Sequence, residues 1–222
     1  PGFKKGDRTD IELPAVQREL IDALHRAGKK IILVNCSGSP IGLEPETQKC
    51  EAILQAWYPG QQGGKAVADV LFGDYNPAGK LPVTFYRNVS QLPDFEDYNM
   101  TGRTYRYMQD VPLFPFGYGL SYTTFGYGKT VFDKNELTAG QSLKLTVPVT
   151  NTGKRNGEEV VQVYLRKQGD AEGPIKTLRA FKRVSIPAGK TVNVEFDLKD
   201  KELEWWDDQS NTVRVCPGNY DI

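Results

Sequence analysis

The sequence predicts an α/β part followed by an all-β part, and two observations lead to this prediction. Before residue 80, continuous apolar runs alternate with helical patterns, as in a parallel α/β layer. After residue 126, short segments alternate apolar and polar residues with turn signals between them, which is typical of a β-sandwich. The 222 residues are enough for two modest domains.

The α/β part begins with a helical pattern, "PAVQRELIDALHRA", at residues 14–27. Its apolar residues recur at helical spacing, Pro14 suits the first turn, and Gly28 suits the end. The apolar runs "IILV" at 31–34 and "CEAILQAWY" at 50–58 are each typical of a strand buried on both faces. A second helix, "GKAVADVLFGD", follows a glycine-rich loop. Strand and helix therefore alternate.

The middle of the chain lacks any lasting periodicity. Residues 87–125 are dense in Pro, Gly, Tyr and Phe, and they form a predicted aromatic-rich linker. The predicted division is residues 1–86, 87–125 and 126–222.

The last part shows the period-2 pattern of strands. In "SLKLTVPVTNTG" the inward positions are Leu143, Leu145, Val147 and Val149. Further strand patterns follow in "EEVVQVYLRK", "TLRAFKRVSIPAGKTVNVEFDL" and "NTVRVCPGNYDI". The segment has about 100 residues, the size of an immunoglobulin-like sandwich domain.

Composition excludes several classes of protein. With 28 basic and 28 acidic residues the formal net charge is zero, so there is no electrostatic footprint for nucleic acid. No run approaches the roughly 20 apolar residues of a membrane span. Cys36, Cys50 and Cys216 form no CxxC motif, which argues against a zinc site or a disulfide framework. Because Pro1 stands in what reads as the middle of a loop, we expect a piece of a longer protein.

Two stretches are candidate binding sites. The loop "PGQQGGK" lies between a strand and a helix, where parallel α/β sheets bind ligands. It is not a nucleotide loop, because Lys65 is followed by Ala66 and no GxGxxG is present. A ligand loop and a purely structural turn both remain open.

The second stretch is "KKGDRTDIELP", just before the first helix. Its charged residues could hold the loop in shape or bind a sugar hydroxyl. We favour the structural role for them, although surface ion pairs add little stability.

Several stretches together resemble the family-3 glycoside hydrolases, in that family's order and spacing. They are "GDRTDIELPAVQRELIDAL", "AWYPGQQGGKAVADVLFGDYNPAGKLPVTF", "RTYRY", "LFPFGYGLSYTTF" and "VTNTGKRNGEEVVQVYL". The opening "PGFKKGDRTDIELP" is more similar to the β-xylosidase branch than to plain β-glucosidases.

The resemblance implies a fold and an activity. Family members begin with a TIM-like barrel that carries the nucleophilic Asp, followed by an α/β sandwich and often a fibronectin type III-like β-sandwich. On this basis residues 1–86 are the C-terminal part of the α/β sandwich domain and residues 126–222 are the fibronectin type III-like domain. The parent would be a retaining, exo-acting hydrolase that removes terminal β-linked xylose or glucose, without metal or organic cofactor.

The catalytic groups are expected outside this chain. A retaining glycosidase needs two carboxyl groups about 5–5.5 Å apart. In one branch of the family the acid/base Glu matches Gln62, and an amide has no proton to donate as an acid. In other branches that Glu would fall upstream of Pro1. We therefore expect no catalytic residue here and four substrate-binding residues: Asp7, Arg8, Gln61 and Gln62.

The resemblance also implies partners. They are a β-linked oligosaccharide and the missing barrel, with no nucleic acid and no membrane, and loss of the barrel predicts self-association. The parent is expected in the periplasm or outside the cell. The alternative is a non-catalytic carbohydrate-binding or structural module that braces a catalytic barrel.

Overall fold

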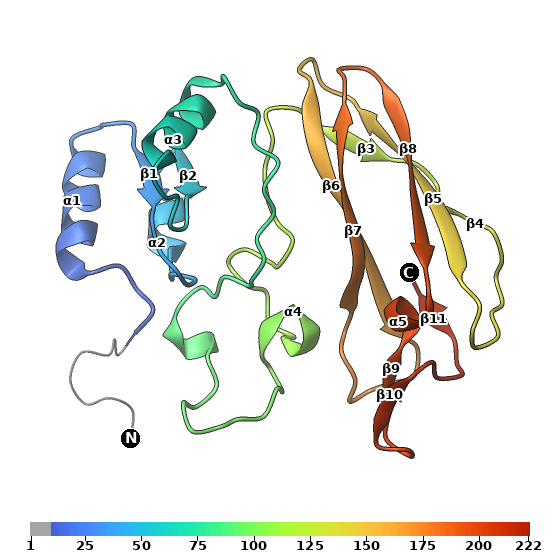
Figure 1. Cartoon of the computed structure of the whole chain (residues 1–222). Helices are drawn as coiled ribbons and strands as arrows, with labels where there is room; N and C mark the ends of the chain where they lie inside the picture. The colour runs from blue at the N-terminus through green and yellow to red at the C-terminus, as the bar shows by residue number, and fades with distance from the viewer. Residues whose placement is uncertain (1–9) are drawn as a thin grey trace. The chain divides into compact units, whose positions relative to one another are not determined.

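The computed structural model describes residues 10–222, and these residues form two compact units (Figure 1). The α/β unit contains the described residues up to Asp74 together with Leu81–Tyr118. The β-sandwich unit contains Tyr75–Lys80 and Gly119–Ile222. The predicted order, an α/β part and then an all-β part, is confirmed. The division at residues 86 and 125 stays a prediction.

The α/β unit contains the two helices and two strands that the apolar patterns predict, together with three short helices that they do not predict. Its elements are α1 (Ala15–Arg26), β1 (Ile32–Asn35), α2 (Glu44–Thr47), β2 (Ala52–Gln55), α3 (Gly63–Phe72), the 3-10 helix η1 (Val89–Gln91) and α4 (Thr104–Tyr107). β1 and β2 are parallel, so the predicted parallel pairing is confirmed. Helix α1 begins after Pro14, and Gly28 follows its end with a left-handed φ of 67°, as the sequence predicts.

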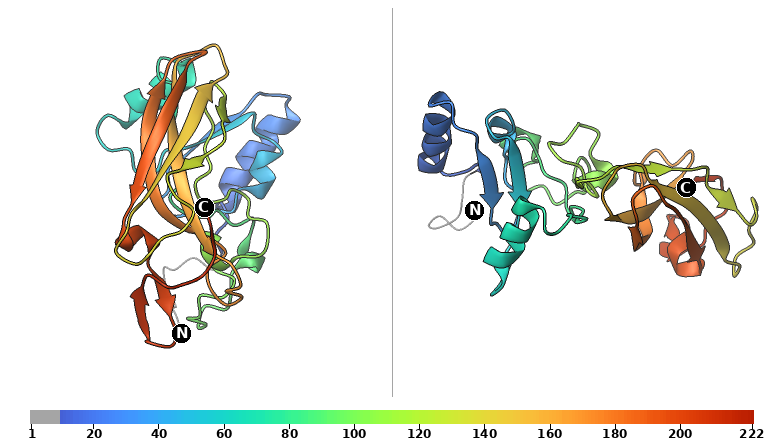
Figure 2. Two further views of the ribbon diagram at one scale, coloured as in Figure 1. Left: turned by 90° about the vertical axis from the view of Figure 1, so that its right-hand side faces the viewer. Right: turned by 90° about the horizontal axis from the view of Figure 1, so that it is seen from above.

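The β-sandwich unit is built from antiparallel strands (Figure 2). They are β3 (Phe125–Tyr127), β4 (Val131–Phe132), β5 (Leu143–Asn151), β6 (Gly157–Lys167), β7 (Thr177–Ile186), β8 (Thr191–Leu198), β9 (Trp205–Asp207), β10 (Thr212–Arg214) and β11 (Tyr220–Asp221), with helix α5 (Asp200–Leu203) after β8. In one sheet β5 pairs with β3, β4 and β8; in the other β6 lies between β11 and β7. Strands β9 and β10 form a separate hairpin.

The sandwich core follows the period-2 pattern of the sequence. The four predicted inward residues of β5, from Leu143 to Val149, are all buried. They pack in one cluster with Val161 and Val163 of β6 and with residues of β8. Burial of such a side chain is worth about 1.5–3 kcal/mol, so this cluster dominates the stability of the unit.

Residues Tyr75–Lys80 belong to the β-sandwich unit although they follow helix α3. The Asn76 amide donates to Asn156 O at 3.0 Å, and its oxygen accepts from the Ser121 hydroxyl at 2.8 Å. The Lys80 ammonium lies 3.3 Å from the carboxylate of the buried Glu159. These bonds hold the segments "YNPAGK" (75–80) and "GLSYTTF" (119–125) against each other and against the strands of the sandwich.

Glycine is required where these two segments meet. A Cβ on Gly119 would lie only 2.0 Å from Gly79 O, a distance that no side chain tolerates. Gly119 therefore permits a close contact between its own backbone and that of Gly79. Among the described residues, no helix has the length and apolar character to cross a membrane.

Candidate functional site

The carboxyl ends of β1 and β2 lie side by side in the α/β unit. Asn35 and Gln55, the last residues of the two strands, are opposite each other, and Ala56 N donates to Asn35 O at 2.9 Å. Since ligands of parallel α/β sheets bind outside the carboxyl ends of the strands, this edge is the first place to search for a site.

A hydrogen-bonded cluster of polar side chains occupies this edge. The buried Asn35 amide donates to Gln55 Oε1 at 2.6 Å and to Ser37 Oγ at 3.0 Å. Gln55 Nε2 donates to Ser37 Oγ at 3.2 Å, and that hydroxyl donates to Ser39 O at 2.8 Å. Gln55 and Ser37 are half-buried, so the cluster is fixed internally but reaches solvent on one side.

The chain turns sharply after β2 at an aromatic residue. Trp57 has a left-handed φ of 55°, which costs a non-glycine residue about 1–2 kcal/mol. Its ring packs edge-on against the buried Phe85 ring at a centroid distance of 6.1 Å. Phe85 in turn contacts Phe114, whose ring stacks on Tyr118. This series of rings compensates the backbone strain and fixes the direction of the loop that follows.

Tyr58 presents its ring to solvent next to the polar cluster. The side chain is 78% exposed, and it lies over the backbone of Gly38, where an added Cβ would be 2.6 Å from Tyr58 Cε2. An exposed ring above a glycine offers a flat apolar surface, the kind on which the apolar face of a sugar stacks.

The glycine-rich loop leads from Tyr58 into helix α3. Gly60 has a left-handed φ of 70°, and its carbonyl accepts from Gly63 N at 3.1 Å. Gln61 and Gln62 are exposed, and Gln62 is the N-cap residue of α3 without a side-chain capping bond. Their amides can donate hydrogen bonds to a ligand and accept hydrogen bonds from it, but they have no acidic proton.

The structure thus places two of the four predicted site residues. Gln61 and Gln62 lie together on one exposed loop, whereas Asp7 and Arg8 lie outside the described residues. The sequence analysis did not assign Asn35, Ser37, Gln55 or Tyr58 to the site. A signal was present for one of them, because the polar Asn35 directly follows the apolar run at 31–34, whereas Gln55 lies inside the run predicted at 50–58.

The buried carboxylate of the α/β unit is held in an ion pair. Glu46 is fully buried, and Arg18 Nε donates to its Oε1 at 2.8 Å. The same guanidinium bonds Glu12 and donates to Gly42 O at 3.0 Å. The hydrogen bond to Glu46 is the largest cause of the raised pKa of Arg18. This arrangement ties α1 to α2 and gives Glu12 a structural role.

Another carboxylate near the sequence motifs is also paired. Glu44 lies 2.6 Å from the Arg87 guanidinium. This contact is an ion pair between residues 43 positions apart in the sequence, which suits a structural role. Among residues 10–222, no group of three or more His, Cys, Asp or Glu side chains could hold a metal ion.

Comparison with known sequences agrees with this architecture. Residues 3–122 match the glycosyl hydrolase family 3 C-terminal domain, and residues 159–222 match the fibronectin type III-like domain. A xylan 1,4-beta-xylosidase of Xylanibacter ruminicola is 60% identical over 221 residues, which is 100% of this chain and 25% of that protein. A periplasmic beta-glucosidase of Salmonella typhimurium is 41% identical over 97% of this chain and 30% of its own length.

Solved structures show the same fold. A β-glucosidase from Erythrobacter marinus matches with a TM-score of 0.84 at 42% identity, over 97% of this chain and 29% of its own. DesR, a β-glucosidase from Streptomyces venezuelae in complex with D-glucose, matches with a TM-score of 0.85 at 34% identity, over 96% of this chain and 29% of its own. The chain therefore spans only a minor share of the length of the proteins that it matches.

Proposed function

The chain belongs to family 3 of the glycosyl hydrolases, as the C-terminal part of such an enzyme, and we propose that the parent protein removes terminal β-linked xylose or glucose from oligosaccharides. The observation that carries this proposal is 60% identity over the whole chain to a xylan 1,4-beta-xylosidase. Xylose is the proposed sugar because the relative with this identity is named for xylan.

This chain would contribute a wall of the sugar site. The exposed amides of Gln61 and Gln62 donate and accept hydrogen bonds, and the Tyr58 ring supplies a flat apolar face. The fixed Asn35–Ser37–Gln55 cluster behind them keeps the strand ends rigid. Asp7 and Arg8 are proposed to bind sugar hydroxyls as well.

The two catalytic carboxyl groups would come from outside this chain. Gln62 stands where one branch of the family has its acid/base Glu, and an amide cannot act as that acid. Glu12, Glu44 and Glu46 are held in ion pairs with arginines. A retaining reaction needs a nucleophile on one face of the sugar and an acid on the other. We assign the nucleophile to an N-terminal barrel of the parent.

The experiment uses the full-length parent with nitrophenyl β-xyloside and β-glucoside. Release of nitrophenol with retained configuration at the sugar carbon is expected, faster for the xyloside. An inactive full-length protein, or an inverted product, would refute the proposed activity.

A second candidate is a non-catalytic module that binds sugar weakly or braces the barrel. The exposed Tyr58 and the two exposed glutamine amides favour sugar binding. Titration of the 222-residue chain with methyl β-xyloside, followed by backbone amide chemical shifts in NMR spectra, distinguishes sugar binding from bracing. Chemical-shift changes confined to Tyr58, Gln61 and Gln62 indicate sugar binding. If no chemical shift changes, bracing of the barrel is the only role that remains for the module.

Helix α1 offers a surface for the missing part of the parent. Val16 is 71% exposed, Leu20 61% and Leu24 38%, and these residues recur every fourth position on one helical face. We propose that the N-terminal part of the parent covers this face and that the isolated chain self-associates through it. Sedimentation should show a mass that falls toward the monomer in Leu20→Lys.

We also propose that the parent acts in the periplasm or outside the cell. The beta-glucosidase of Salmonella typhimurium is named periplasmic. Fractionation of cells that express the full-length gene tests this proposal, because activity retained in the cytoplasm would contradict it.

A further inference from the structure

The β9–β10 hairpin presents a tryptophan to solvent. Trp206 is opposite Val213 in the register of the hairpin, and these two residues are 50% and 53% exposed. The next pair, Trp205 and Arg214, is also opposite, and Trp205 is buried. Because successive residues of a strand point to opposite faces, one face of the hairpin carries the buried Trp205 and the other carries Trp206 and Val213.

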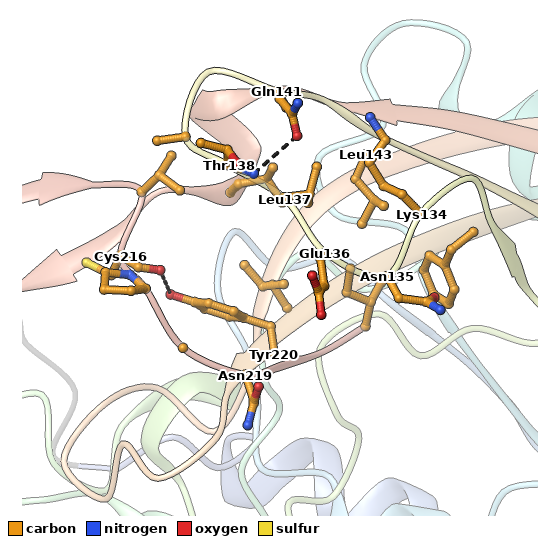
Figure 3. A pocket seen from close by; sticks show the side chains of 18 of the residues that line it. Lys134, Asn135, Glu136, Leu137, Thr138, Gln141, Leu143, Cys216, Asn219 and Tyr220 are labelled. Atoms are coloured by element: carbon orange, nitrogen blue, oxygen red, sulfur yellow. Dashed lines mark hydrogen bonds between the residues drawn. The ribbon is translucent and has the colours of Figure 1, made fainter.

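The hairpin is anchored without the exposed ring. Trp205 packs in a buried cluster with Cys216, and its ring meets that of Tyr220 edge-on at a centroid distance of 6.1 Å. Figure 3 shows the Tyr220 hydroxyl directed toward Cys216, whose carbonyl accepts from it at 2.9 Å. Trp205 Nε1 donates to Asp170 Oδ2 at 2.7 Å. These contacts attach the hairpin to the β-sandwich unit, so the Trp206 ring is not required for that attachment.

The turn of the hairpin is fixed by Asp207. Its Oδ2 accepts from Ser210 N at 3.2 Å and from Arg214 Nε at 2.7 Å. Asn211 has a left-handed φ of 52°, a conformation in which asparagine is enriched. A two-stranded hairpin is marginally stable by itself, so these bonds and the buried Trp205 keep its outer face in one conformation.

The orientation of the Trp206 ring is set by its own N–H group. Trp206 Nε1 donates to Asp208 Oδ1 at 2.8 Å. Because an N–H···O hydrogen bond prefers to be nearly linear, the Asp208 carboxylate lies near the plane of the indole, at its edge. The carboxylate therefore leaves the face of the ring uncovered. Its two oxygens offer about four acceptor positions, so Asp208 can also accept a hydrogen bond from a ligand.

This arrangement matches the chemistry of a pyranose ring. A β-linked xylosyl or glucosyl unit has C–H bonds on its faces and hydroxyls around its rim. When such a unit lies flat on the indole, its C–H bonds cover the apolar ring and its hydroxyls point toward the ring edge, where Asp208 accepts. The exposed side-chain amides of Gln209 and Asn211 follow in the same turn and can both donate and accept.

Other occupants use fewer of these groups. A cation above the indole would be attracted by the ring, but it would lie away from the Asp208 carboxylate at the ring edge. An apolar protein surface would cover the ring, but it would also remove water from the carboxylate without replacing the lost hydrogen bonds, which is costly for a charged group. A neutral sugar chain satisfies the ring and the carboxylate together.

We propose that the outer face of the β9–β10 hairpin binds a neutral chain of β-linked pyranose units, with one unit stacked on Trp206 and its hydroxyl donating to Asp208. Val213, opposite Trp206, extends the apolar surface beside the ring. The hairpin belongs to the β-sandwich unit, whereas the Gln61–Gln62 loop belongs to the α/β unit. The inference therefore adds a second binding site and does not depend on the proposed activity.

The test follows the indole N–H signals of the 222-residue chain by NMR during titration with xylohexaose and with cellohexaose. The chain has three tryptophans, and the Trp206 signal is assigned by its loss in Trp206→Ala. We expect at least one of the two hexasaccharides to shift the Trp206 signal, while the signal of the buried Trp205 stays in place.

The variants measure the contribution of each group. In Trp206→Ala the dissociation constant, followed at the backbone amide of Val213, should rise about tenfold, because the stacking surface is lost. Asp208→Ala should raise it several-fold, since an acceptor is lost. Phe181→Ala is the matched control, because this ring is also exposed and also belongs to the β-sandwich unit, but lies on β7. It should leave the dissociation constant unchanged.

Three results would overturn the proposal: no shift of the Trp206 signal with either hexasaccharide, an unchanged dissociation constant in Trp206→Ala, or a response to tetramethylammonium chloride without a response to sugar. The last result would indicate a cation site. An unchanged Trp205 signal confirms folding of each variant, and the titration of the original chain needs no variant at all. Shifts at Tyr58, Gln61 and Gln62 report on the other proposed site, so the two proposals are tested separately.

Discussion

The ring of Trp57 packs edge-on against the ring of Phe85, with centroids 6.1 Å apart and planes inclined by 69°. Trp57 carries the left-handed backbone that ends β2, and Phe85 is 1% exposed. A strained backbone conformation persists only where its surroundings fix it. The contact therefore links the direction of the Gln61–Gln62 loop to a buried residue about 25 positions further along the chain.

Replacement of Phe85 by alanine should destabilise the α/β unit and release this loop. Loss of a fully buried phenylalanine costs about 3–5 kcal/mol. Phe72 of α3 is the matched control, because it is 84% exposed and its replacement should cost less than about 0.5 kcal/mol. Urea unfolding followed by tryptophan fluorescence measures both values. Equal costs for the two variants would show that the ring series does not hold the loop.

Replacement of Asn151 by alanine should destabilise the β-sandwich unit by about 3 kcal/mol, because buried partners would lose their hydrogen bonds. The fully buried amide donates to Arg155 O at 2.7 Å and Ile186 O at 2.9 Å, and its oxygen accepts from Thr123 Oγ1 at 2.6 Å. The exposed Asn193 of β8 is the matched control. Thermal unfolding should show a clear drop for the first variant alone, and a similar drop for both would contradict this role.

The pKa of Asp207 should lie at about 2 in the folded protein, chiefly because of the side-chain hydrogen bond from Ser210 and then that from Arg214. The ordinary value of an aspartate is about 3.9. A lowered folded-state pKa means that this carboxylate stabilises the β9–β10 hairpin above about pH 4 and that the stabilisation is lost as the pH falls toward 2. Carboxyl NMR titration should find this value and a rise toward 3.9 in Ser210→Ala. An unchanged pKa in that variant would assign the shift to Arg214.

The sequence predicts the elements that rest on local patterns. The alternation at Leu143–Val149 gives β5, because burial on one face leaves its period in the sequence. The continuous run before Asn35 gives β1, but the prediction that this strand is buried on both faces is wrong, since Ile32 is 53% exposed. The four-residue helix α2 was not predicted, since it is too short to show a period. The sequence also did not predict that Tyr75–Lys80 belongs to the β-sandwich unit. This placement depends on hydrogen bonds such as that from Asn76 to Asn156 O, which join residues 80 positions apart.

The site was predictable in part for the same reason. The loop of Gln61 and Gln62 stands out through its glycines and its position between strand and helix. Gln55 and Asn35 become a pair only through the parallel register of β1 and β2, which no local pattern fixes. The position of the Tyr58 ring over Gly38 likewise depends on a contact between residues far apart in the sequence, which no local pattern shows.

The 222-residue chain alone should not hydrolyse nitrophenyl β-xyloside or β-glucoside between acid and neutral pH. General acid help alone contributes about 10²–10⁴-fold, and a retaining mechanism also needs a nucleophile. Gln62→Glu supplies at most one of the two carboxyl groups, so this variant should remain inactive as well. Turnover that disappears in Glu44→Ala, a residue paired here with Arg87, would place the active site within this chain and contradict the prediction.

In the full-length parent, Gln62→Ala should weaken substrate use by about 1 kcal/mol, the typical value of one neutral hydrogen bond. The effect should appear as a raised KM with kcat nearly unchanged, because an amide that only binds sugar stabilises the ground state and the transition state alike. Gln48→Ala, at an exposed glutamine that follows α2, is the matched control and should leave both constants unchanged. A thousandfold loss of kcat in Gln62→Ala would mean that this loop takes part in the chemical step itself.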